Sequence, residues 1–123
     1  MKRLLILLVM AAALHVGAAR AHGDDKARHG GQIQMAGETK FELVAKGDTV
    51  EVYLDDHGQT LPTARLSGKL NVLSGSARSE ARLEPAAGDK LVAKGVKLVK
   101  GDKVIALVTM EDKKTASARF VIR

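Results

Sequence analysis

The sequence predicts an all-β protein, an immunoglobulin-like antiparallel β-sandwich of seven or eight strands preceded by a cleaved signal peptide. After an apolar leader and a polar stretch, apolar and polar residues alternate in short runs, which is typical of strands with one buried face. Turn-forming clusters separate these runs at the spacing of roughly 8–12 residues seen in antiparallel sandwiches. These observations predict a signal peptide over 1–21, a flexible arm rich in His and Gly over 22–31, and a sandwich domain over 32–123.

The first 21 residues have the three parts of a secretory signal peptide. The basic residues of 1–3 precede the apolar run LLILLVMAAAL, and the small residues of Ala19-Arg20-Ala21 follow it. The apolar run is about a dozen residues long, shorter than the roughly 20 that span a bilayer, although an uncleaved anchor helix is the alternative. Cleavage after Ala21 predicts an exported, periplasmic protein with no stable membrane insertion.

Composition excludes several classes of function. The chain has 20 basic and 14 acidic residues, and loss of the three basic residues of the leader leaves a net charge of +3. That charge is too small, and too evenly mixed with acids, to predict a nucleic-acid partner. Cysteine is absent, so the domain must be held by its core without disulfides. The only aromatic residues are Phe41, Tyr53 and Phe120, which argues against a surface for stacking bases or sugars.

The expected strands follow one another from residue 40 onward. In the first run, Phe41, Leu43 and Ala45 face one side, whereas Glu42 and Val44 face the other. In the second run, Val52 faces one side and Tyr53 faces the other. For residues 64–73 a short helix is the alternative. The runs with strand alternation are 40–45, 49–56, 68–75, 79–85, 89–95, 103–110 and 116–123. The turn-like clusters lie at 46–48, 55–58, 74–76, 85–89, 100–102 and 111–114.

No pattern in the sequence predicts an enzyme. No serine of the mature chain lies in a G-x-S-x-G setting, and there is no cysteine nucleophile. Acidic residues on alternating strands are typical of solvated faces. No glycine-rich phosphate loop follows a strand and opens a helix.

The polar arm carries a candidate metal site. Cleavage after Ala21 would make His22 the first residue, whose α-amine, with a pKa of about 8, and imidazole can chelate one ion. Nitrogen donors favour Cu(II), Ni(II) or Zn(II), with copper ahead on intrinsic affinity. His29 offers a further nitrogen, and Asp24 or Asp25 offers an oxygen.

A second histidine position lies in a predicted turn. His57 follows Asp55 and Asp56, and it is a candidate ligand if the arm reaches it across the sandwich. The alternatives are ordinary: His57 is a turn residue, His29 with its two glycines is the entry to the first strand, and polar residues commonly follow a cleavage site.

Three stretches of the sequence resemble a known family. HGG at 29–31, FELV at 41–44 and VEVYLDDHGQTLP at 50–62 are similar to the N-terminal β-rich segment of periplasmic adaptor (membrane fusion) proteins of heavy-metal resistance-nodulation-division efflux systems. They also resemble small exported proteins that carry the same segment. The likeness continues through LEPAAGDKLVAKG and SARFVI. It implies a small periplasmic β-sandwich associated with metal handling, and it marks 29–31 and 55–58 as positions of interest.

The resemblance has a limit that bears on function. The sequence contains no long helical hairpin and no lipoyl-like domain. We therefore expect that this chain does not by itself bridge an inner-membrane pump to an outer-membrane channel.

Two hypotheses of different classes follow. The first is a periplasmic metal-binding accessory protein that captures copper or zinc through His22 and His29, with His57 a candidate third ligand, and buffers the ion or passes it to an efflux protein. It requires no cofactor for folding. The second is a non-catalytic interaction module of the cell envelope without metal binding, whose strand edge or face docks on a partner. In that case basic strand residues face an acidic partner, for example Lys94, Lys97, Lys100 and Lys103.

Overall fold

A computed structural model describes residues 26–123, and every regular element among them is a β-strand. All strand pairs are antiparallel, so the predicted all-β antiparallel domain is confirmed. No helix in this part of the chain is long and apolar enough to cross a membrane. The strands are β1 (Gln32–Ala36), β2 (Thr39–Lys46), β3 (Thr49–Asp56), β4 (Gln59–Thr60), β5 (Ser67–Ser74), β6 (Ala77–Ala86), β7 (Lys90–Lys94), β8 (Lys103–Thr109) and β9 (Thr115–Val121).

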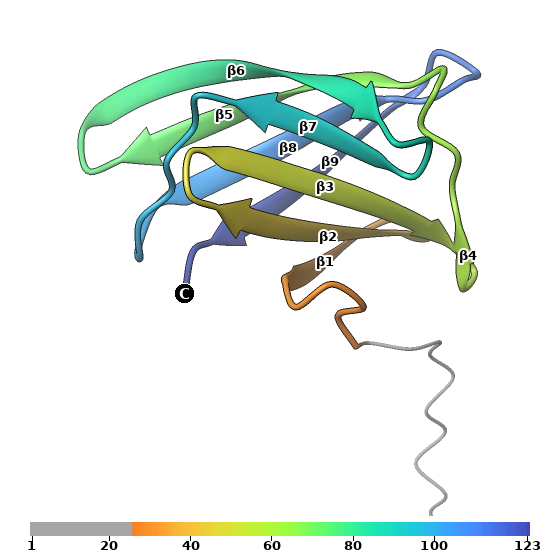
Figure 1. Cartoon of the computed structure of the whole chain (residues 1–123), viewed down its shortest axis with the longest axis horizontal. Helices are drawn as coiled ribbons and strands as arrows, with labels where there is room; N and C mark the ends of the chain where they lie inside the picture. Colours follow the sequence, from red (N-terminus) through yellow and green to blue (C-terminus); the bar gives the residue numbers. More distant parts are fainter. Residues whose placement is uncertain (1–25) are drawn as a thin grey trace, which may run out of the picture.

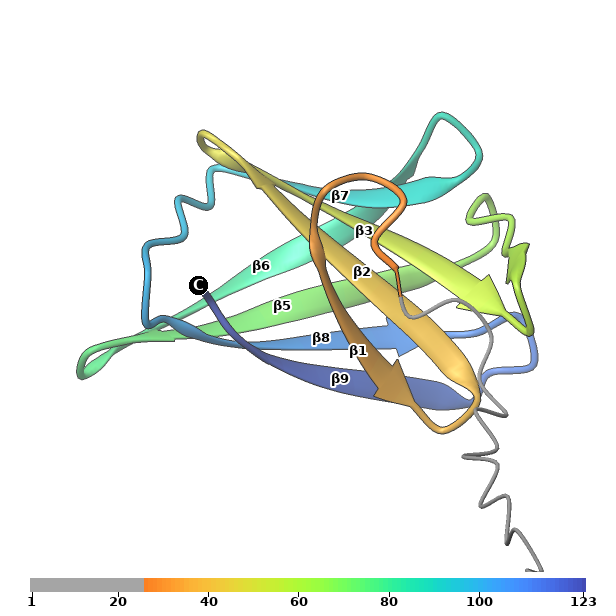
Figure 2. The same cartoon turned by 90° about the horizontal axis from the view of Figure 1, so that it is seen from below.

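The strands join edge to edge in the order β1-β2-β3-β7-β6-β5-β8-β9, and the short β4 pairs with β3 (Figures 1 and 2). The long strand β6 connects two groups of strands, because its first part pairs with β5 and Glu84–Ala86 pair with β7. At the ends of this order, β1 and β9 lie side by side. The Gln32 side chain donates to the Val121 carbonyl over 2.9 Å and accepts from the Arg123 N–H over 3.0 Å. The result is a nearly closed sheet.

The details differ from the sequence prediction in two respects. Residues 26–123 form nine strands, because β1 and the two-residue β4 add to the seven alternating runs. The structure does not confirm the finer prediction of an immunoglobulin-like sandwich, because its strands join into one sheet. The segment for which a short helix was the alternative, residues 64–73, forms most of strand β5.

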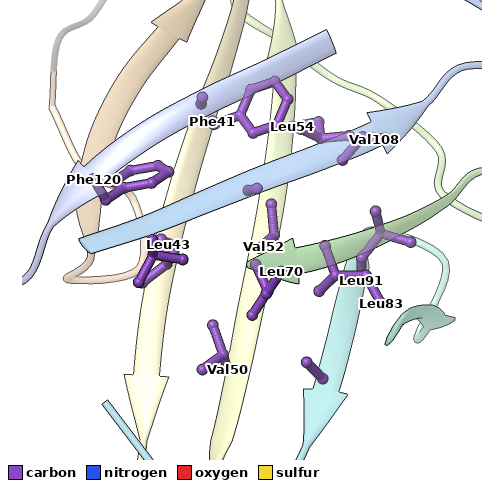
Figure 3. Close-up of a cluster of buried hydrophobic side chains, with 14 of the residues drawn as sticks. Phe41, Leu43, Val50, Val52, Leu54, Leu70, Leu83, Leu91, Val108 and Phe120 are labelled. Atoms are coloured by element: carbon purple, nitrogen blue, oxygen red, sulfur yellow. The ribbon is translucent and has the colours of Figure 1, made fainter. Parts of the chain in front are cut away.

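The alternation along each strand sends one row of side chains into a common core (Figure 3). Phe41 and Leu43 of β2, with Val52 of β3, are buried there, as the sequence predicted. Ala45 is exposed at the end of its strand, against expectation. The same alternation places the residues between them, such as Glu42, on the outer face of the sheet. The remaining buried apolar residues are Val44, Val50, Leu54, Leu66, Leu70, Val72, Leu83, Leu91, Ala93, Val104, Ala106, Val108, Ala118, Phe120 and Ile122.

The β3–β4 hairpin has the shortest kind of connection. Asp56 pairs with Gln59, which leaves His57 and Gly58 as a two-residue loop. Both have positive φ, +49° and +82°, as a type I′ hairpin turn requires. The Asp-His-Gly sequence therefore has a local structural reason, independent of metal binding.

Candidate functional site

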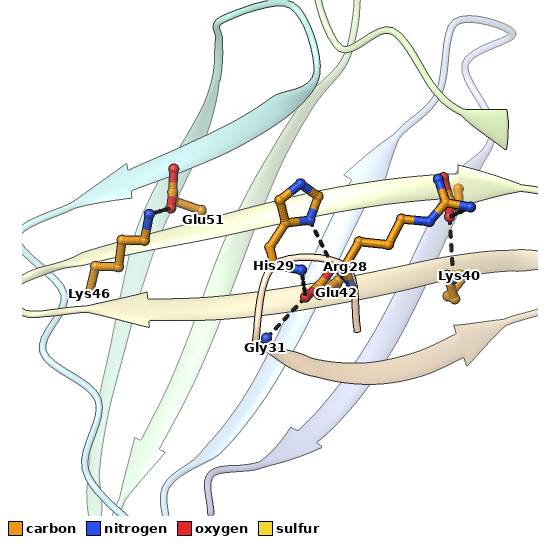
Figure 4. Close-up of polar contacts among 8 residues, drawn as sticks. Arg28, His29, Gly31, Lys40, Glu42, Lys46 and Glu51 are labelled. Atoms are coloured by element: carbon orange, nitrogen blue, oxygen red, sulfur yellow. Dashed lines mark hydrogen bonds and ion pairs between the residues drawn. The ribbon is translucent and has the colours of Figure 1, made fainter. Parts of the chain in front are cut away.

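The outer face of β2 carries a buried carboxylate that holds the segment before β1. Glu42 is only 4% exposed, because residues 28–31, here called the latch, lie over it (Figure 4). The Arg28 N–H donates to Oε1 of Glu42 over 3.1 Å. The N–H groups of His29 and Gly31 donate to Oε2 over 2.8 and 2.9 Å. The end of the predicted arm is thus hydrogen-bonded to the sheet.

The two glycines of the latch make this contact possible. Gly30 has φ of +75°, a left-handed conformation that side chains with a Cβ rarely adopt. At Gly31 a Cβ would lie 2.3 Å from the carbonyl oxygen of Leu43 and 2.8 Å from Cγ2 of Val44. The sequence His-Gly-Gly is therefore what allows the backbone to approach β2 this closely.

The His29 ring is held on two sides. Its Nδ1 lies 2.9 Å from Oε1 of Glu42, and its plane stacks on the Tyr53 ring, with 3.5 Å between centroids and 6° between planes. Because a carboxylate only accepts hydrogen bonds, the contact assigns the proton to Nδ1 and the lone pair to Nε2. No hydrogen bond from residues 26–123 reaches Nε2, which points away from Glu42 in Figure 4. The side chain is 36% exposed, so solvent reaches the ring.

The charge state of Glu42 follows from these contacts. Burial alone raises its pKa, but the hydrogen bonds from the His29 ring and from the backbone N–H groups of Gly31, His29 and Arg28 outweigh burial. The net effect holds the pKa of Glu42 below its ordinary value. The carboxylate is therefore ionised at neutral pH and can orient the imidazole.

A second buried carboxylate connects the latch to the β3–β4 turn. Asp55 lies 3.3 Å from Nζ of Lys40 and 3.7 Å from Nη2 of Arg28. The same Arg28 nitrogen donates to the Gly58 carbonyl over 3.2 Å. The three stretches on which the resemblance rests, 29–31, 41–44 and 50–62, thus meet on one face of the sheet.

A third acid of this face is also neutralised within the domain. Glu51 is buried, with Nζ of Lys46 2.8 Å from Oε1 and Lys90 paired to Oε2. The ion pair with Lys46 and the hydrogen bond from Lys90 hold the pKa of Glu51 below its ordinary value. The pairing with Glu51 in turn raises the pKa of Lys90.

There is almost no internal space at the latch. The gap beside His29, Tyr53 and Asp55 has a volume of about 10 Å³, which is about the space for one water molecule. An organic substrate does not fit there. A ligand of His29 must approach Nε2 from the solvent side.

The other predicted metal ligands have different outcomes. His22, Asp24 and Asp25 lie outside the described residues, as does the predicted signal peptide. Nε2 of His57 lies 3.0 Å from Glu38 and 3.4 Å from Asp56, and its side chain is 69% exposed. Within 26–123 no contact joins His57 to His29. In the same range, no group of three or more His, Cys, Asp or Glu residues is arranged to hold a metal ion.

Sequence reasoning identified His29 but missed the residues that hold it. Glu42 and Tyr53 were predicted only to face away from the core. They are direct neighbours across β2 and β3. Glu42 contacts Nδ1 of the His29 ring, and Tyr53 stacks on its face. The available signal in the sequence was the apolar Val44, which alternation places on the same outer side as Glu42. An apolar residue on an outer side indicates that another segment covers it.

Comparison of the chain with models of protein families, with curated proteins and with solved structures gave no match. The resemblance to adaptor segments therefore stays a prediction. The functional assignment must rest on the chemistry of the latch.

Proposed function

We propose that the protein is a periplasmic metal-binding accessory protein that captures Cu(II) or Zn(II), with Nε2 of His29 as a ligand. The observation that supports the proposal is the contact between Nδ1 of His29 and Glu42. A carboxylate that accepts the N–H of one ring nitrogen fixes the tautomer, orients the ring and raises the basicity of the other nitrogen. Tyr53 restricts the same ring by stacking.

His29 supplies only one ligand, and the rest must come from the segment before the latch. The six residues between His22 and His29 span up to about 20 Å when extended, so the α-amine and imidazole of His22 can reach the same ion. Asp24 or Asp25 adds an oxygen. Because the latch already fixes His29, this ligand needs no rearrangement to bind the ion. Cleavage after Ala21, and export itself, are parts of the proposal.

Capture of the ion has a defined proton balance. The metal takes the lone pair of Nε2, while the Nδ1 proton stays in its hydrogen bond to Glu42. At the chain terminus the α-amine must lose a proton to bind. The affinity of the site for the metal ion therefore falls as the pH is lowered. Binding that is reversible in this way suits a protein that buffers the ion or passes it to an efflux protein.

A calorimetric titration with Cu(II) and with Zn(II) tests the proposal. The protein is produced with its own leader and purified after export, and mass spectrometry identifies its first residue. We expect His29→Ala to weaken binding at least tenfold, and Glu42→Gln to weaken it by about 10- to 100-fold, as for other residues that orient a metal ligand. His57→Ala is the matched control, and it should change the affinity less than twofold. Binding unchanged by His29→Ala would contradict the proposal.

A further inference from the structure

The outer face of the sheet opposite the latch strands is hollow. An open hollow of about 960 Å³ lies over β6, β5, β8 and β9, and Gln32 and Gln34 of β1 also line it. Leu73, Ile105 and Val121 line this hollow, on three adjacent strands. They face outward because their neighbours along each strand face the core, and Val121 is 56% exposed. Apolar side chains are thus gathered at this hollow, where Leu73 and Ile105 are half-buried.

Basic side chains surround this apolar surface. Arg78 and Lys103 each pair in register with Leu73, and Arg119 pairs with Ile105. All three are exposed, and none forms an ion pair within residues 26–123. The acid that lines the hollow, Glu80, lies 3.7 Å from Lys69. The surface therefore carries positive charge that the domain does not neutralise, unlike the latch face with its paired acids.

We propose that this hollow is a docking surface for an acidic segment of a partner protein that carries apolar side chains. Apolar side chains of the segment would cover Leu73, Ile105 and Val121, and its carboxylates would pair with Arg78, Lys103 and Arg119. Complementary charge fixes the register of such a complex and speeds its formation. Four strands about 4.8 Å apart span roughly 14 Å, which matches four or five residues of extended chain.

Charge and shape select this occupant over the others. If a second copy of the chain docked by the same face, Arg78, Lys103 and Arg119 of one copy would meet the same residues of the other. Like charges that meet in an interface are unfavourable. A flat lipid surface would leave the hollow unfilled. Of the two predicted modes of docking, at a strand edge or on a face, this site would use a face, because the nearly closed sheet pairs its strands. Of the four predicted lysines, Lys103 lies in it.

Titration of the exported, ¹⁵N-labelled protein followed by NMR tests the docking surface. The probe is the peptide acetyl-ELELELE-amide, which is acidic and has an apolar row. We expect shifts of the amides of Leu73, Ile105 and Val121, binding that weakens with salt, and at least tenfold weaker binding of both ESESESE and KLKLKLK. A chelator should leave the affinity unchanged, since this surface does not depend on the metal proposal.

Charge reversal supplies the decisive comparison. Lys103→Glu with Arg119→Glu should weaken peptide binding at least tenfold. The matched control reverses the same number of charges at Lys113 and Lys114, in the turn between β8 and β9, and should change affinity less than twofold. The proposal would be overturned if both double variants lost affinity equally, or if the amide shifts were confined to other strands. It would also be overturned if dodecanoate bound as tightly as the peptide. Circular dichroism verifies that both variants fold.

Discussion

Replacement of Glu42 by Gln is the perturbation that the structure resolves best. Each carboxylate oxygen accepts two hydrogen bonds: Oε1 from the Arg28 N–H and the His29 ring, and Oε2 from the N–H groups of His29 and Gly31. Glutamine has nearly the same shape, but it presents an NH₂ donor in place of one oxygen. With the NH₂ at the Oε2 position, the N–H groups of His29 and Gly31 lose their acceptor. With the NH₂ at the Oε1 position, the Arg28 N–H loses its acceptor and the His29 ring must change tautomer so that Nδ1 accepts.

The magnitude follows from these contacts. A buried donor left without an acceptor costs about 1–3 kcal/mol, which is the range for the orientation that leaves only the Arg28 N–H without a partner. The latch lies at the start of the domain, so it can leave the sheet and regain water, and this limits the cost. We therefore expect Glu42→Gln to lower the free energy of unfolding by about 2 kcal/mol, and the amides of residues 28–31 to exchange faster.

Urea unfolding and hydrogen exchange measure the two effects. The matched control is Glu84→Gln, an exposed side chain 4.0 Å from Arg82, for which we expect a change below about 0.5 kcal/mol. If Glu42→Gln were as harmless as this control, with the latch amides still protected, the reasoning about the buried carboxylate would be refuted.

Three further predictions concern the same latch. Gly31→Ala should release the latch and cost about 1–3 kcal/mol, because its Cβ would meet the Leu43 carbonyl at 2.3 Å; urea unfolding and exchange of the latch amides measure it. Because the folded pKa of Glu42 lies below the unfolded value of about 4.5, its stabilising effect is complete above that pH and is lost as the pH falls through the folded pKa. Unfolding between pH 7 and 3 should show this loss, and Glu42→Gln should reduce it. Tyr53→Ala should cost about 0.5–1.5 kcal/mol more than Tyr53→Phe, which keeps the stacked ring, and equal losses would count against the stacking.

The strands were predictable because their alternation is local. Phe41 and Leu43 face the core as their spacing indicates, and each predicted turn cluster lies at the end of a strand. The order of strands was not predictable, because β3 pairs with β7 and β5 with β8, neither of which is its neighbour in the chain. Without those pairings, the sequence does not distinguish a nearly closed sheet from a sandwich.

The candidate site was predictable only in part. His29 stood out by residue type, but alternation assigned Glu42 to the outer face without indicating that a segment 11–14 residues earlier covers it. The latch can cover Glu42 because Gly30 has a positive φ and because Gly31 has no Cβ to meet the Leu43 carbonyl. Both requirements are properties of the folded backbone. Of the four lysines predicted to face an acidic partner from strands, Lys97 and Lys100 lie in the loop before β8. Strand alternation therefore does not determine where they face.

In the proposed metal site, His29 binds the ion through Nε2 while Glu42 holds Nδ1. The most direct test is a long-range ¹H–¹⁵N spectrum of the histidine rings, recorded on the exported protein with and without Zn(II). We predict that the Nε2 resonance of His29 moves to the metal-bound range while Nδ1 stays protonated, and that the His57 ring is unchanged. An unchanged His29 ring at zinc saturation, or coordination through Nδ1 with loss of the contact to Glu42, would contradict the account.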